Sequence, residues 1–461
     1  MRIAVAGTGY VGLVSGVCLA HVGHEVTCVD NVPERVAAVN KGAPPFHEPG
    51  LSDLLSSGLR EGRLQASTNL AAAVAASEVI LIAVGTPSAA GHIDLGAVEA
   101  AAREIGQGLG SCAEYKVVAV KSTVVPGTTD TLVRGILEQA AGKPAGAFGL
   151  CMNPEFLREG VAVRDFLEPD RIVIGQWDTT SGARLAHVYE SFNCPKIFTG
   201  LRNAELTKYA SNALLATLIS FSNEMAGLCE ATPGTDIAEV LAALVLDRRW
   251  SPVVDGVRVC PEILTYLRAG CGFGGSCLPK DVAALRGFAR EQGVPTRLIE
   301  AVLEVNALRP AAIVAQIEEA LGSLQGSRIA ILGVSFKPGT DDLRESPALS
   351  ILRLLADAGA EVRAYDPVVK TFAGAAGTTL CASLEEALDG ADAAVVVTPW
   401  PEIVAADWRV LAPRMRSRVI VDARNGLDAA ALPDGIRYLG IGRGRHPRRG
   451  DELGKSGTQG N

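Results

Sequence analysis

The sequence lacks several features that would each define a class of protein. No apolar run approaches the ~18 residues that a membrane-spanning helix needs. Basic residues are not in excess, and the formal net charge of −8 at pH 7 argues against broad affinity for nucleic acid or anionic membranes. Aromatic residues make up only 5% of the chain, so we expect a globular core built mainly from Val, Ala, Leu and Ile.

The cysteines lack the spacing of disulfide-rich or metal-binding proteins. The ten cysteines include no C-x-x-C pair, and several lie in apolar runs. This pattern favours reduced thiols in a cytoplasmic protein and predicts no metal site. A strand is expected from the second residue, which leaves no room for a signal peptide. The length of 461 residues is enough for about three domains.

A glycine-rich run near the N-terminus predicts a dinucleotide site. The run Gly7-Thr8-Gly9-Tyr10-Val11-Gly12 follows an apolar strand at residues 2–6 and opens a helical pattern that continues to about His21. Gly7 allows the tight turn, Gly9 lets the pyrophosphate approach the backbone, and Gly12 lets helix and strand pack closely. The helix N-terminus would then face the phosphates with free N–H groups.

The acid at the end of the second strand indicates which dinucleotide binds. Asp30 lies eighteen residues after Gly12 and ends an apolar strand at residues 25–29. A carboxylate at this place accepts hydrogen bonds from the adenosine ribose hydroxyls and repels a 2′-phosphate, so NAD is favoured over NADP. Arg35 weakens that preference slightly.

Two later loops leave strand ends on the expected cofactor side. They are Val84-Gly85-Thr86-Pro87 and the segment 121–127, which contains Ser122 and Thr123. Ligands gather at the carboxyl ends of strands in open parallel sheets, so these hydroxyls are candidates to contact the nicotinamide ribose or a substrate. For Thr86 and Ser122, helix capping explains the sequence equally well.

The remaining pattern predicts an α/β fold. Strands at 79–84 and 117–120, with Ala-rich helices between them, predict a parallel sheet covered on both faces. The middle of the chain has the pattern of long helices, and a second open sheet follows. The fold class is therefore two Rossmann-like doubly wound parallel-sheet domains joined by a helical domain with a long central helix. The expected helices are 205–230, 301–321 (despite Pro310) and 350–358, and the later strands are 328–333, 361–365, 393–398 and 419–422.

The segment Gly272–Asp281 carries the strongest chemical signal. It sets Cys277 on a glycine-rich turn, with Lys280 and Asp281 three and four residues later. Small neighbours let a substrate reach the sulfur, and a nearby cation can favour the thiolate. With the dinucleotide motif, this pattern predicts a nicotinamide-dependent oxidation that passes through a covalent thiol adduct.

Two pairs of polar residues have no obvious role in folding. Glu155 and Glu159 lie four residues apart, so they share one face if that stretch is helical. Lys208 and Asn212 lie one turn apart on the long helix, which suits either a ligand-facing stripe or a solvated face.

The motifs together carry a resemblance to a known family. The chain resembles the UDP-glucose/GDP-mannose 6-dehydrogenase family from residue 1 to about residue 441. The matching motifs, in chain order, are GTGYVGLV, Glu48-Pro49-Gly50-Leu51, STVVPGTT, NPEFLREG, the Lys208 and Asn212 pair, GFGGSCLPKD, and the run Phe336–Asp342 that continues into Arg344-Glu345-Ser346-Pro347.

The resemblance implies an activity. It is the NAD-dependent four-electron oxidation of UDP-glucose at C6 to UDP-glucuronate through a thiohemiacetal and a thioester on Cys277, with GDP-mannose as the alternative substrate. Lys208 and Asp281, with a water between them, would assist proton removal and stabilise the developing oxyanion, and Asn212 would share that role. Glu155 and Thr123 would position the water that hydrolyses the thioester.

The resemblance also assigns ligand contacts and domains. It implies a cytoplasmic homodimer with a small-molecule substrate, an NAD-binding domain at 1–200, a central helical and dimerisation domain at 201–322 and a UDP-sugar-binding domain at 323–441. The basic segment 442–461 lies beyond the resemblance and has no periodicity, so we expect it to be a disordered tail. The cofactor-binding residues would be Gly7, Gly9, Tyr10, Val11, Gly12, Asp30, Arg35, Gly85, Thr86, Ser122, Thr123, Glu159 and Lys280. The substrate-binding residues would be Glu155, Phe156, Leu157, Glu159, Lys208, Asn212, Tyr266, Leu267, Gly274, Phe336, Lys337 and Arg424.

One position departs from the family pattern. Many relatives have an Arg-Ile-Gly sequence sixteen residues before the cysteine, and that arginine crosses the dimer interface to the partner's substrate. Pro261 occupies the position here, and Arg258 is the nearby candidate to replace the arginine.

Three other functions are weaker. An N-acetylmannosamine-type relative would have a different pattern around the cysteine. A single-step hydroxyacid-type dehydrogenase would have no use for Cys277 or for a second α/β domain. A non-catalytic NAD or nucleotide-sugar sensor would be expected to lose Cys277, Lys208 or Asp281, and all three are present.

Overall fold

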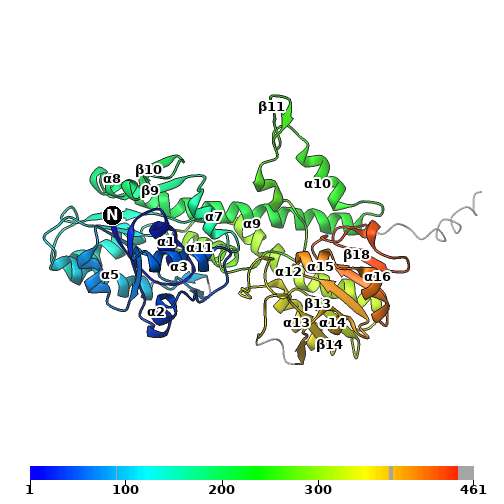
Figure 1. The fold of residues 1–461 in the computed structure, drawn as a ribbon. Coiled ribbons are helices and arrows are strands. Elements are labelled where there is room, and N and C mark those ends of the chain that lie inside the picture. The colour runs from blue at the N-terminus through cyan, green and yellow to red at the C-terminus, as the bar shows by residue number, and fades with distance from the viewer. Residues whose placement is uncertain (90, 373–376, 445–461) are drawn as a thin grey trace, which may run out of the picture. The chain divides into compact units, whose positions relative to one another are not determined.

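The computed structural model describes residues 1–89, 91–372 and 377–444, so most of the predicted disordered tail lies outside the described residues. The chain forms two compact units (Figure 1). The first contains Met1–Ser211 and Ala283–Pro295, and the second contains Asn212–Val282 and the chain from Thr296 onward. Among the described helices, none is long and apolar enough to cross a membrane. The division into three domains and a tail stays a prediction.

An eight-stranded sheet forms the centre of the first unit, in the order β10-β9-β8-β7-β4-β1-β2-β3. The predicted strands at the N-terminus are confirmed. One pair differs from the expected parallel sheet, because β9 runs antiparallel to β8. Mixed sheets of this kind are common. Here β9 and β10 run parallel to each other and antiparallel to the neighbouring strand β8. The strands are β1 (Arg2–Ala6), β2 (Glu25–Val29), β3 (Leu64–Ser67), β4 (Val79–Ile82), β7 (Val117–Val120), β8 (Gly149–Met152), β9 (Ile172–Gln176) and β10 (Lys196–Gly200).

Both faces of this sheet are covered, as the near-continuous apolar strands predict. Successive side chains of a strand point to opposite faces. In β1, Ile3 and Val5 belong to one buried core, whereas Ala4 and Ala6 belong to another. The first core is packed by α1 (Tyr10–His21), α3 (Leu51–Arg60), α7 (Ala162–Leu167) and α8 (Thr179–Val188), and the second by α4 (Leu70–Ala76), α5 (Gly96–Gly110) and α6 (Arg134–Ala141).

Smaller elements complete the first unit. The hairpin of β5 (Ser88–Ala89) and β6 (His92–Ile93) follows β4. After β7, the segment Thr128–Val133 forms the π-helix η1. The helix α2 (Pro33–Asn40) follows Asp30 and carries Arg35.

The second unit is built on an all-parallel six-stranded sheet, in the order β15-β14-β13-β16-β17-β18. Its two faces also belong to different cores, since Ile329 and Ile331 of β13 lie in one and Ala330 and Leu332 in the other. The second predicted open sheet is therefore confirmed. Its strands are β13 (Arg328–Leu332), β14 (Glu361–Tyr365), β15 (Thr378–Leu380), β16 (Ala393–Val396), β17 (Val419–Asp422) and β18 (Arg437–Gly440).

The helices of the middle of the chain follow the predicted pattern. The helix α9 (Leu201–Ala231) begins in the first unit and continues into the second, and α12 (Arg297–Leu321) contains Pro310 in its interior. The helix α11 (Leu278–Glu291) begins directly after Cys277. The other helices of this part of the chain are α10 (Ile237–Val245), η2 (Glu262–Tyr266), α13 (Pro347–Asp357), α14 (Leu384–Leu388), α15 (Pro401–Val404), α16 (Trp408–Leu411), η3 (Ala412–Arg414) and η4 (Ala429–Ala431).

A short hairpin in the second unit was not expected from the sequence. Its strands are β11 (Val253–Val254) and β12 (Val257–Arg258). The two residues between them, Asp255 and Gly256, have φ angles of 51° and 78°. Two positive φ values in succession match the tight turn for which Asp-Gly is a strong signal, so the sequence did contain the cue.

Candidate active site

The glycine turn between β1 and α1 has the shape of a phosphate cradle. Gly7 has a φ of +106°, a conformation that other residues rarely adopt, and an added Cβ would lie 2.5 Å from the carbonyl oxygen of Ala83. A Cβ on Gly9 would meet nothing within 4 Å, so the space beside the Gly9 backbone is open. The turn leads directly into the N-terminus of α1, where unpaired N–H groups favour an anion. The residues present therefore fit a dinucleotide pyrophosphate.

Asp30 ties this turn to the end of β2. Its Oδ2 accepts hydrogen bonds from the backbone N–H of Thr8 (2.9 Å) and from the Thr8 hydroxyl (2.6 Å), and its Oδ1 accepts one from Val32 (3.0 Å). The Arg35 guanidinium lies 3.8 Å away. Burial alone would raise the pKa of the Asp30 carboxyl, but these bonds outweigh it and hold the pKa below its ordinary value. The carboxylate is thus ionised, as a ribose acceptor needs to be.

The hydroxyls of Thr86 and Ser122 do not cap helices, so that explanation of them is wrong. Thr86 Oγ1 donates to the carbonyl of Thr123 (2.9 Å), and Ser122 Oγ donates to that of Val84 (2.7 Å). The loops after β4 and β7 belong to neighbouring strands, so each loop can satisfy the hydroxyl of the other. The two bonds hold Gly85 and Thr123 at the carboxyl edge of the sheet.

Glu48 links three segments that are far apart in the sequence. Its carboxylate is buried and accepts hydrogen bonds from the hydroxyl of Tyr10 and from the backbone N–H groups of Gly160 and Ala162, the last two at 2.7 Å each. The Tyr10 ring also packs on Phe46. Burial raises the pKa of the Tyr10 hydroxyl, and the nearby Glu48 carboxylate raises it further. Glu48 therefore fixes the first residue of α1 against the turn that follows Glu159.

Replacement of Glu48 by glutamine should loosen the cofactor side of the first unit. The amide NH₂ cannot accept a hydrogen bond, so one buried N–H group loses its partner at a cost of about 1–3 kcal/mol. We expect a lower free energy of unfolding and a higher KM for NAD. Tyr10→Phe is the matched control, because it removes one donor and leaves both backbone bonds to Glu48, so its loss should be smaller. Equal stability and equal KM in Glu48→Gln and the wild type would contradict this assignment.

Glu155 and Lys208 form a buried ion pair in the first unit. Lys208 Nζ lies 2.9 Å from Glu155 Oε1, and the exposed fractions of the two side chains are 4% and 6%. The other Glu155 oxygen accepts a hydrogen bond from the backbone N–H of Leu157 (2.7 Å). Burial would raise the pKa of Glu155, but the Lys208 ammonium and these bonds outweigh it, so the pKa lies below its ordinary value. Even with its oxygens buried, the carboxylate stays charged.

The segment that carries Glu155 and Glu159 is not helical, so the shared-face argument for these two residues does not apply. Residues 153–158 form a loop without regular secondary structure after β8, and Glu159 lies in the turn that follows. Glu155 and Glu159 are both buried. Phe156 packs beneath two cations, with the Arg171 guanidinium 4.1 Å and the Lys208 ammonium 5.6 Å from its ring centroid. Leu157 packs against the core below the sheet.

Backbone hydrogen bonds hold the loop that leads to Cys277. Asn306 of α12 makes a two-point contact with Phe273: its Oδ1 accepts from the backbone N–H (2.7 Å) and its Nδ2 donates to the carbonyl (3.1 Å). Asn223 and Arg309 bind the N–H and the carbonyl of Gly270 at 2.7 and 3.0 Å. These three residues were not predicted from the sequence, because each is a polar residue on a long helix and belongs to no motif.

Cys277 lies at the end of this loop and is partly exposed. Its Sγ lies 3.6 Å from the Oγ of Ser276. Its carbonyl accepts a hydrogen bond from the N–H of Asp281 (2.8 Å) in the first turn of α11. Cys277 therefore lies at the N-terminus of a helix, where the helix dipole is positive.

Asp281 joins two predicted site residues of the second unit. It is 1% exposed and accepts a hydrogen bond from Asn212 Nδ2 at 2.6 Å. Its other oxygen lies 2.5 Å from Lys280 Nζ. The Lys280 charge, which the sequence suggested as a partner for the Cys277 thiolate, is thus paired with Asp281. The buried positions of Asn212 and Asp281 exclude the solvated-face explanation for Asn212.

Predicted substrate residues of the second unit lie at the carboxyl ends of its strands. Phe336 and Lys337 follow β13, with the ammonium 5.5 Å from the ring centroid. Arg424 follows β17, and its Nε donates to the carbonyl of Val397 (3.2 Å), which follows β16. These three strands are neighbours. A Cβ on Gly275 would lie 2.7 Å from the Phe336 ring, so the cysteine loop packs directly on this residue.

The other residues predicted to bind the substrate, Tyr266, Leu267 and Gly274, lie near one another in the sequence. Tyr266 ends η2, and the adjoining Leu267 is buried. Gly274 packs against the backbone of Glu345.

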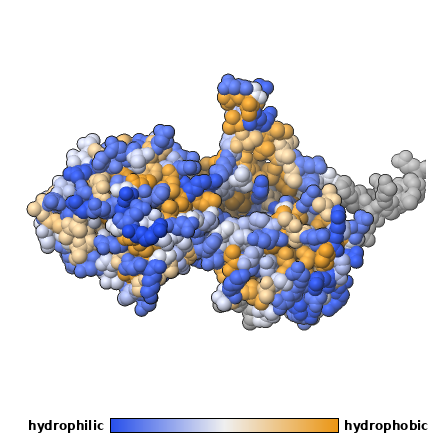
Figure 2. All heavy atoms as spheres, in the orientation of Figure 1, coloured by the Kyte–Doolittle hydropathy of each residue, from blue (hydrophilic) through white to orange (hydrophobic). Residues whose placement is uncertain are grey.

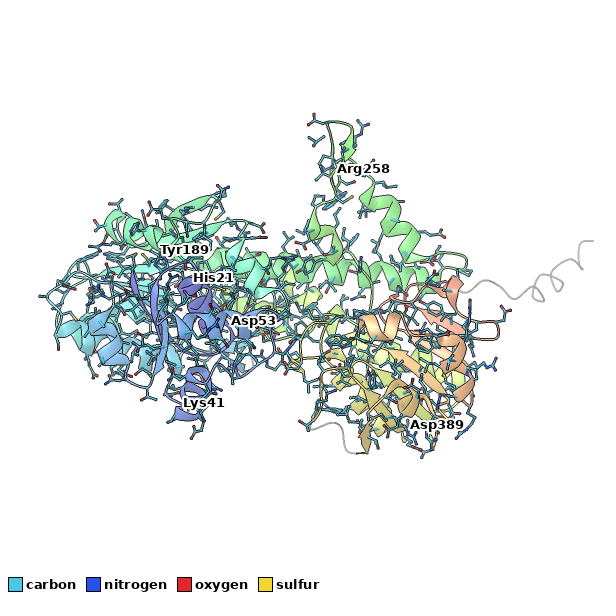
Figure 3. The ribbon with its side chains drawn as sticks, in the orientation of Figure 1. His21, Lys41, Asp53, Tyr189, Arg258 and Asp389 are labelled. Atoms are coloured by element: carbon cyan, nitrogen blue, oxygen red, sulfur yellow. The ribbon has the colours of Figure 1, made fainter. Side chains whose placement is uncertain are left out.

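Arg258 is engaged within its own chain. It lies on the hairpin of β11 and β12 (Figure 3). Its Nη1 donates to the carbonyls of Leu246 (2.9 Å) and Ser251 (2.8 Å) and to the Ser251 hydroxyl (2.8 Å). These bonds close the base of the hairpin, so one amino group of the guanidinium already has a structural role.

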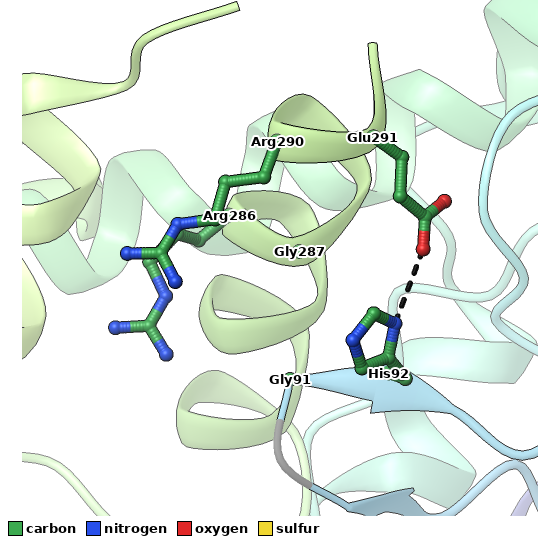
Figure 4. Close-up of a pocket in the computed structure, with 6 residues that line it drawn as sticks. All are labelled: Gly91, His92, Arg286, Gly287, Arg290 and Glu291. Carbon is green, nitrogen blue, oxygen red and sulfur yellow. Dashed lines mark hydrogen bonds and ion pairs between the residues drawn. The ribbon is translucent and has the colours of Figure 1, made fainter. Parts of the chain in front are cut away.

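One cavity of the first unit lies apart from these residues. It has a volume of about 290 Å³ and is bordered by the β5–β6 hairpin and α11 (Figure 4). An exposed hydrogen bond between the side chains of His92 and Glu291 (3.1 Å) lies at its edge, while Arg286 and Arg290 point away from these two residues in the view. None of the predicted catalytic, cofactor or substrate residues lines it.

Comparison with known families decides the classification. Three family models match in the order of the fold: the UDP-glucose/GDP-mannose dehydrogenase family NAD binding domain at residues 1–193, its central domain at 202–308 and its UDP binding domain at 330–429. The chain belongs to the UDP-glucose/GDP-mannose dehydrogenase family. It is accordingly an NAD-dependent nucleotide-sugar dehydrogenase, and the resemblance found in the motifs is confirmed.

Individual relatives match along nearly the whole chain. A UDP-glucose 6-dehydrogenase of Rhizobium meliloti is 43% identical over 455 residues, which cover 96% of this chain and 100% of the relative. A GDP-mannose 6-dehydrogenase of Azotobacter vinelandii is 40% identical over 80% of this chain and 82% of its own. The solved structure of a UDP-glucose dehydrogenase from Pyrobaculum islandicum aligns with a TM-score of 0.85 at 38% identity and covers 96% of this chain and 97% of its own.

Proposed function

We propose that the enzyme oxidises UDP-glucose at C6 to UDP-glucuronate in two successive oxidations, the second of them on an adduct with Cys277. The single observation that carries this proposal is the presentation of a partly exposed cysteine at the N-terminus of α11, on a loop fixed by Asn306. The relatives that match over 96% of the chain and bear the name UDP-glucose 6-dehydrogenase support the choice of sugar. GDP-mannose is the alternative substrate, because a relative named for it is 40% identical.

The first unit would hold the cofactor. The Gly7–Gly12 turn and the N-terminus of α1 suit the pyrophosphate, and Asp30 suits the ribose hydroxyls. The loops of Thr86 and Ser122 would border the nicotinamide end. When bound, NAD accepts a hydride at each of the two oxidation steps.

The chain's own residues would manage the protons and the intermediates. Lys208 and Asp281, with Asn212, would assist removal of the hydroxyl proton and stabilise negative charge on oxygen. The Cys277 thiolate would attack the C6 aldehyde to form a thiohemiacetal, whose oxidation leaves a thioester.

Water would complete the reaction. Glu155, which stays ionised, and Thr123 would position a water that attacks the thioester carbonyl, and the thiolate of Cys277 leaves. The net change consumes one water, transfers two hydrides to two molecules of NAD, and yields the carboxylate and three protons. Because the aldehyde stays bound to sulfur, the site avoids release of a reactive intermediate.

The nucleotide would bind the second unit. Lys337 and Arg424 lie at the carboxyl edge of its sheet and supply the positive charge that a diphosphate needs, with Arg424 offering a forked donor.

Comparison of kcat/KM for UDP-glucose, GDP-mannose and UDP-N-acetylmannosamine tests the substrate. We expect UDP-glucose to be preferred by about a hundredfold or more, since unpaired polar groups penalise the wrong base or sugar. Equal or higher kcat/KM with GDP-mannose would overturn the choice of sugar, but the proposed mechanism would still stand.

We also propose that two copies of the chain form a dimer through the central helices, in a reducing compartment such as the cytoplasm that suits the free cysteines. Leu214, Phe221 and Leu228 lie seven residues apart on α9 and are 53%, 41% and 59% exposed. A spacing of seven places them along one helix face. Hydrophobic residues also cover α10 and the adjoining hairpin (Figure 2), where Val257 is 68% exposed.

A charged side chain on this face of α9 should dissociate the dimer. We expect Leu228→Glu to give a monomer in analytical ultracentrifugation at concentrations where the wild type is a dimer, because two carboxylates would be buried together. Glu224→Gln is the control: it lies between Phe221 and Leu228 on the same helix and removes a charge instead of adding one, so the variant should remain a dimer. A wild-type monomer would contradict the proposal.

A further inference from the structure

A buried lysine that no motif assigned lies beside the Glu155 loop. Lys121 follows β7 directly, and its side chain is 4% exposed. Its backbone N–H donates to the carbonyl of Ile82 (2.8 Å), so the residue continues the sheet for one more step. The place is the carboxyl edge of a parallel sheet, where ligands bind in such folds. An ammonium is rarely buried this far unless something compensates its charge.

Asn153 is the direct partner of Lys121. Lys121 Nζ donates to Asn153 Oδ1 at 3.1 Å, and the Tyr189 hydroxyl donates to the same oxygen at 2.6 Å. The amide nitrogen of Asn153 donates to the carbonyl of Val173 in β9 (3.0 Å). Asn153 begins the loop in which Glu155 is the third residue. Lys121 thus holds the start of that loop from one side while β9 holds it from the other.

Few other groups near Lys121 compensate for the positive charge of its buried ammonium. Its ammonium lies 5.8 Å from the Phe166 ring centroid and 5.9 Å from that of Tyr189. The charged groups that act on it are Glu155, which favours its protonated form, and Lys208, which disfavours it. Tyr189 is the titratable group that shares Asn153 with it, and burial moves the pKa of that hydroxyl further upward. Two cations therefore lie near one buried carboxylate.

Electrostatics in this cluster are coupled. Burial lowers the pKa of Lys121 from 10.5 to about 8, despite the opposing effect of Glu155. The Lys121 ammonium in turn helps to hold the pKa of Glu155 low, after the larger effects of Lys208 and of the Leu157 N–H. At neutral pH the lysine is mostly protonated, so its charge acts on Glu155 under ordinary conditions.

We propose that Lys121 is a positioning residue for the hydrolytic step: through Asn153 it fixes the loop that carries Glu155, and its charge adds to that of Lys208 in favouring the anionic form of Glu155. This inference rests on the proposed role of Glu155 in the hydrolysis of the thioester. Lys121 makes no contact with the reacting atoms in this account, and it acts only through Asn153 and through its field at the carboxylate.

Kinetics of Lys121→Met test the proposal. Methionine has nearly the same shape but no charge and no N–H donor. We expect kcat with UDP-glucose to fall about tenfold to a hundredfold, as a small misplacement of a catalytic group costs, while KM for NAD changes less than about twofold. The wild-type profile of kcat against pH should show a change near pH 8 that the variant lacks. A variant with wild-type kcat and an unchanged profile overturns the proposal.

Two further variants separate charge from anchoring. Lys121→Arg keeps a positive charge that does not titrate in this range, so it should recover part of kcat and also lack the change near pH 8. Tyr189→Phe removes the other hydrogen bond to Asn153 Oδ1 and leaves the charge, so it should keep the pH change. If the arginine variant is no more active than the methionine variant, the charge plays no part and that half of the proposal is wrong.

A measurement without substrate separates this inference from the proposed function. Between pH 8 and 10.5 the unfolded chain holds a proton on Lys121 that the folded chain has lost, so the free energy of unfolding rises with pH across this window. The difference between wild type and Lys121→Met should therefore rise over the same range. A flat difference would show that Lys121 is not a buried titrating ammonium, whatever substrate the enzyme uses, whereas an enzyme inactive on every nucleotide sugar would refute only the function.

Discussion

Cys277→Ser is expected to stop steady-state formation of UDP-glucuronate, with kcat reduced by about 10⁴-fold or more, as loss of a covalent nucleophile costs in other enzymes. A serine hydroxyl is far less acidic than a thiol and so supplies almost no nucleophilic anion at neutral pH. The first oxidation does not need the sulfur, so a single turnover should still yield some NADH and aldehyde. NADH absorbance in steady state, with the product identified by chromatography, measures the effect.

Two neighbouring substitutions serve as controls for Cys277→Ser. Ser276→Ala removes the hydroxyl 3.6 Å from the sulfur, and Cys271→Ser changes a buried cysteine of the same loop. Both should keep kcat within about tenfold of the wild type, since neither group forms a bond to the substrate. Full turnover by the Cys277→Ser enzyme would exclude the thioester route.

Lys208→Met is expected to lower kcat by about 10²- to 10³-fold, because it removes a group that assists proton transfer and stabilises charge on oxygen. It should also lower the free energy of unfolding by about 3 kcal/mol, since Glu155 is left charged in a buried place. That cost lies at the low end of the range because Lys121 remains near Glu155. Stopped-flow kinetics and denaturant unfolding measure the two effects.

The double variant Lys208→Met with Glu155→Gln separates catalysis from stability. Neither charge is then buried alone, so most of the lost stability should return, as the 2.9 Å contact between the two groups implies. Activity should stay low, because both chemical groups are gone. Recovery of activity together with stability would mean that Lys208 has only a structural role.

Local patterns predicted most of the fold. The strands β1 and β2, the helix α9 and the second sheet were all visible in apolar runs and helical periodicity, because those patterns reflect which side chains must be buried. The antiparallel pairing of β9 with β8 was not visible, since a buried strand has the same composition in either direction. The hairpin at Asp255 and Gly256 was missed because each of its strands has only two residues.

The candidate site was predictable where chemistry depends on a motif. The glycine turn, Asp30 and the Cys277 loop lie where their spacing placed them, because each motif is local in the chain. Residues that act across the fold were not predictable. Lys121 and Asn306 meet their partners, Asn153 and Phe273, across 32 and 33 residues of sequence.

The hydrogen-bond partners of the loop hydroxyl groups were likewise not predictable from local sequence. The pairing of Thr86 with the Thr123 carbonyl depends on two strands being neighbours, which the sequence does not state. The carboxylates of the 153–160 segment were assigned to a shared helix face only on the condition that the segment is helical. Its contacts with Glu48, Lys208 and Lys121 instead favour an irregular loop.

The number of NADH molecules formed per UDP-glucose tests the central claim most directly. With limiting UDP-glucose and excess NAD, the account predicts about two NADH for each sugar, since two successive hydride transfers occur before the product leaves. UDP-glucuronate should account for all of the sugar consumed. One NADH per sugar, with free aldehyde in solution, would contradict the account, because the adduct on Cys277 would then have no part in the reaction.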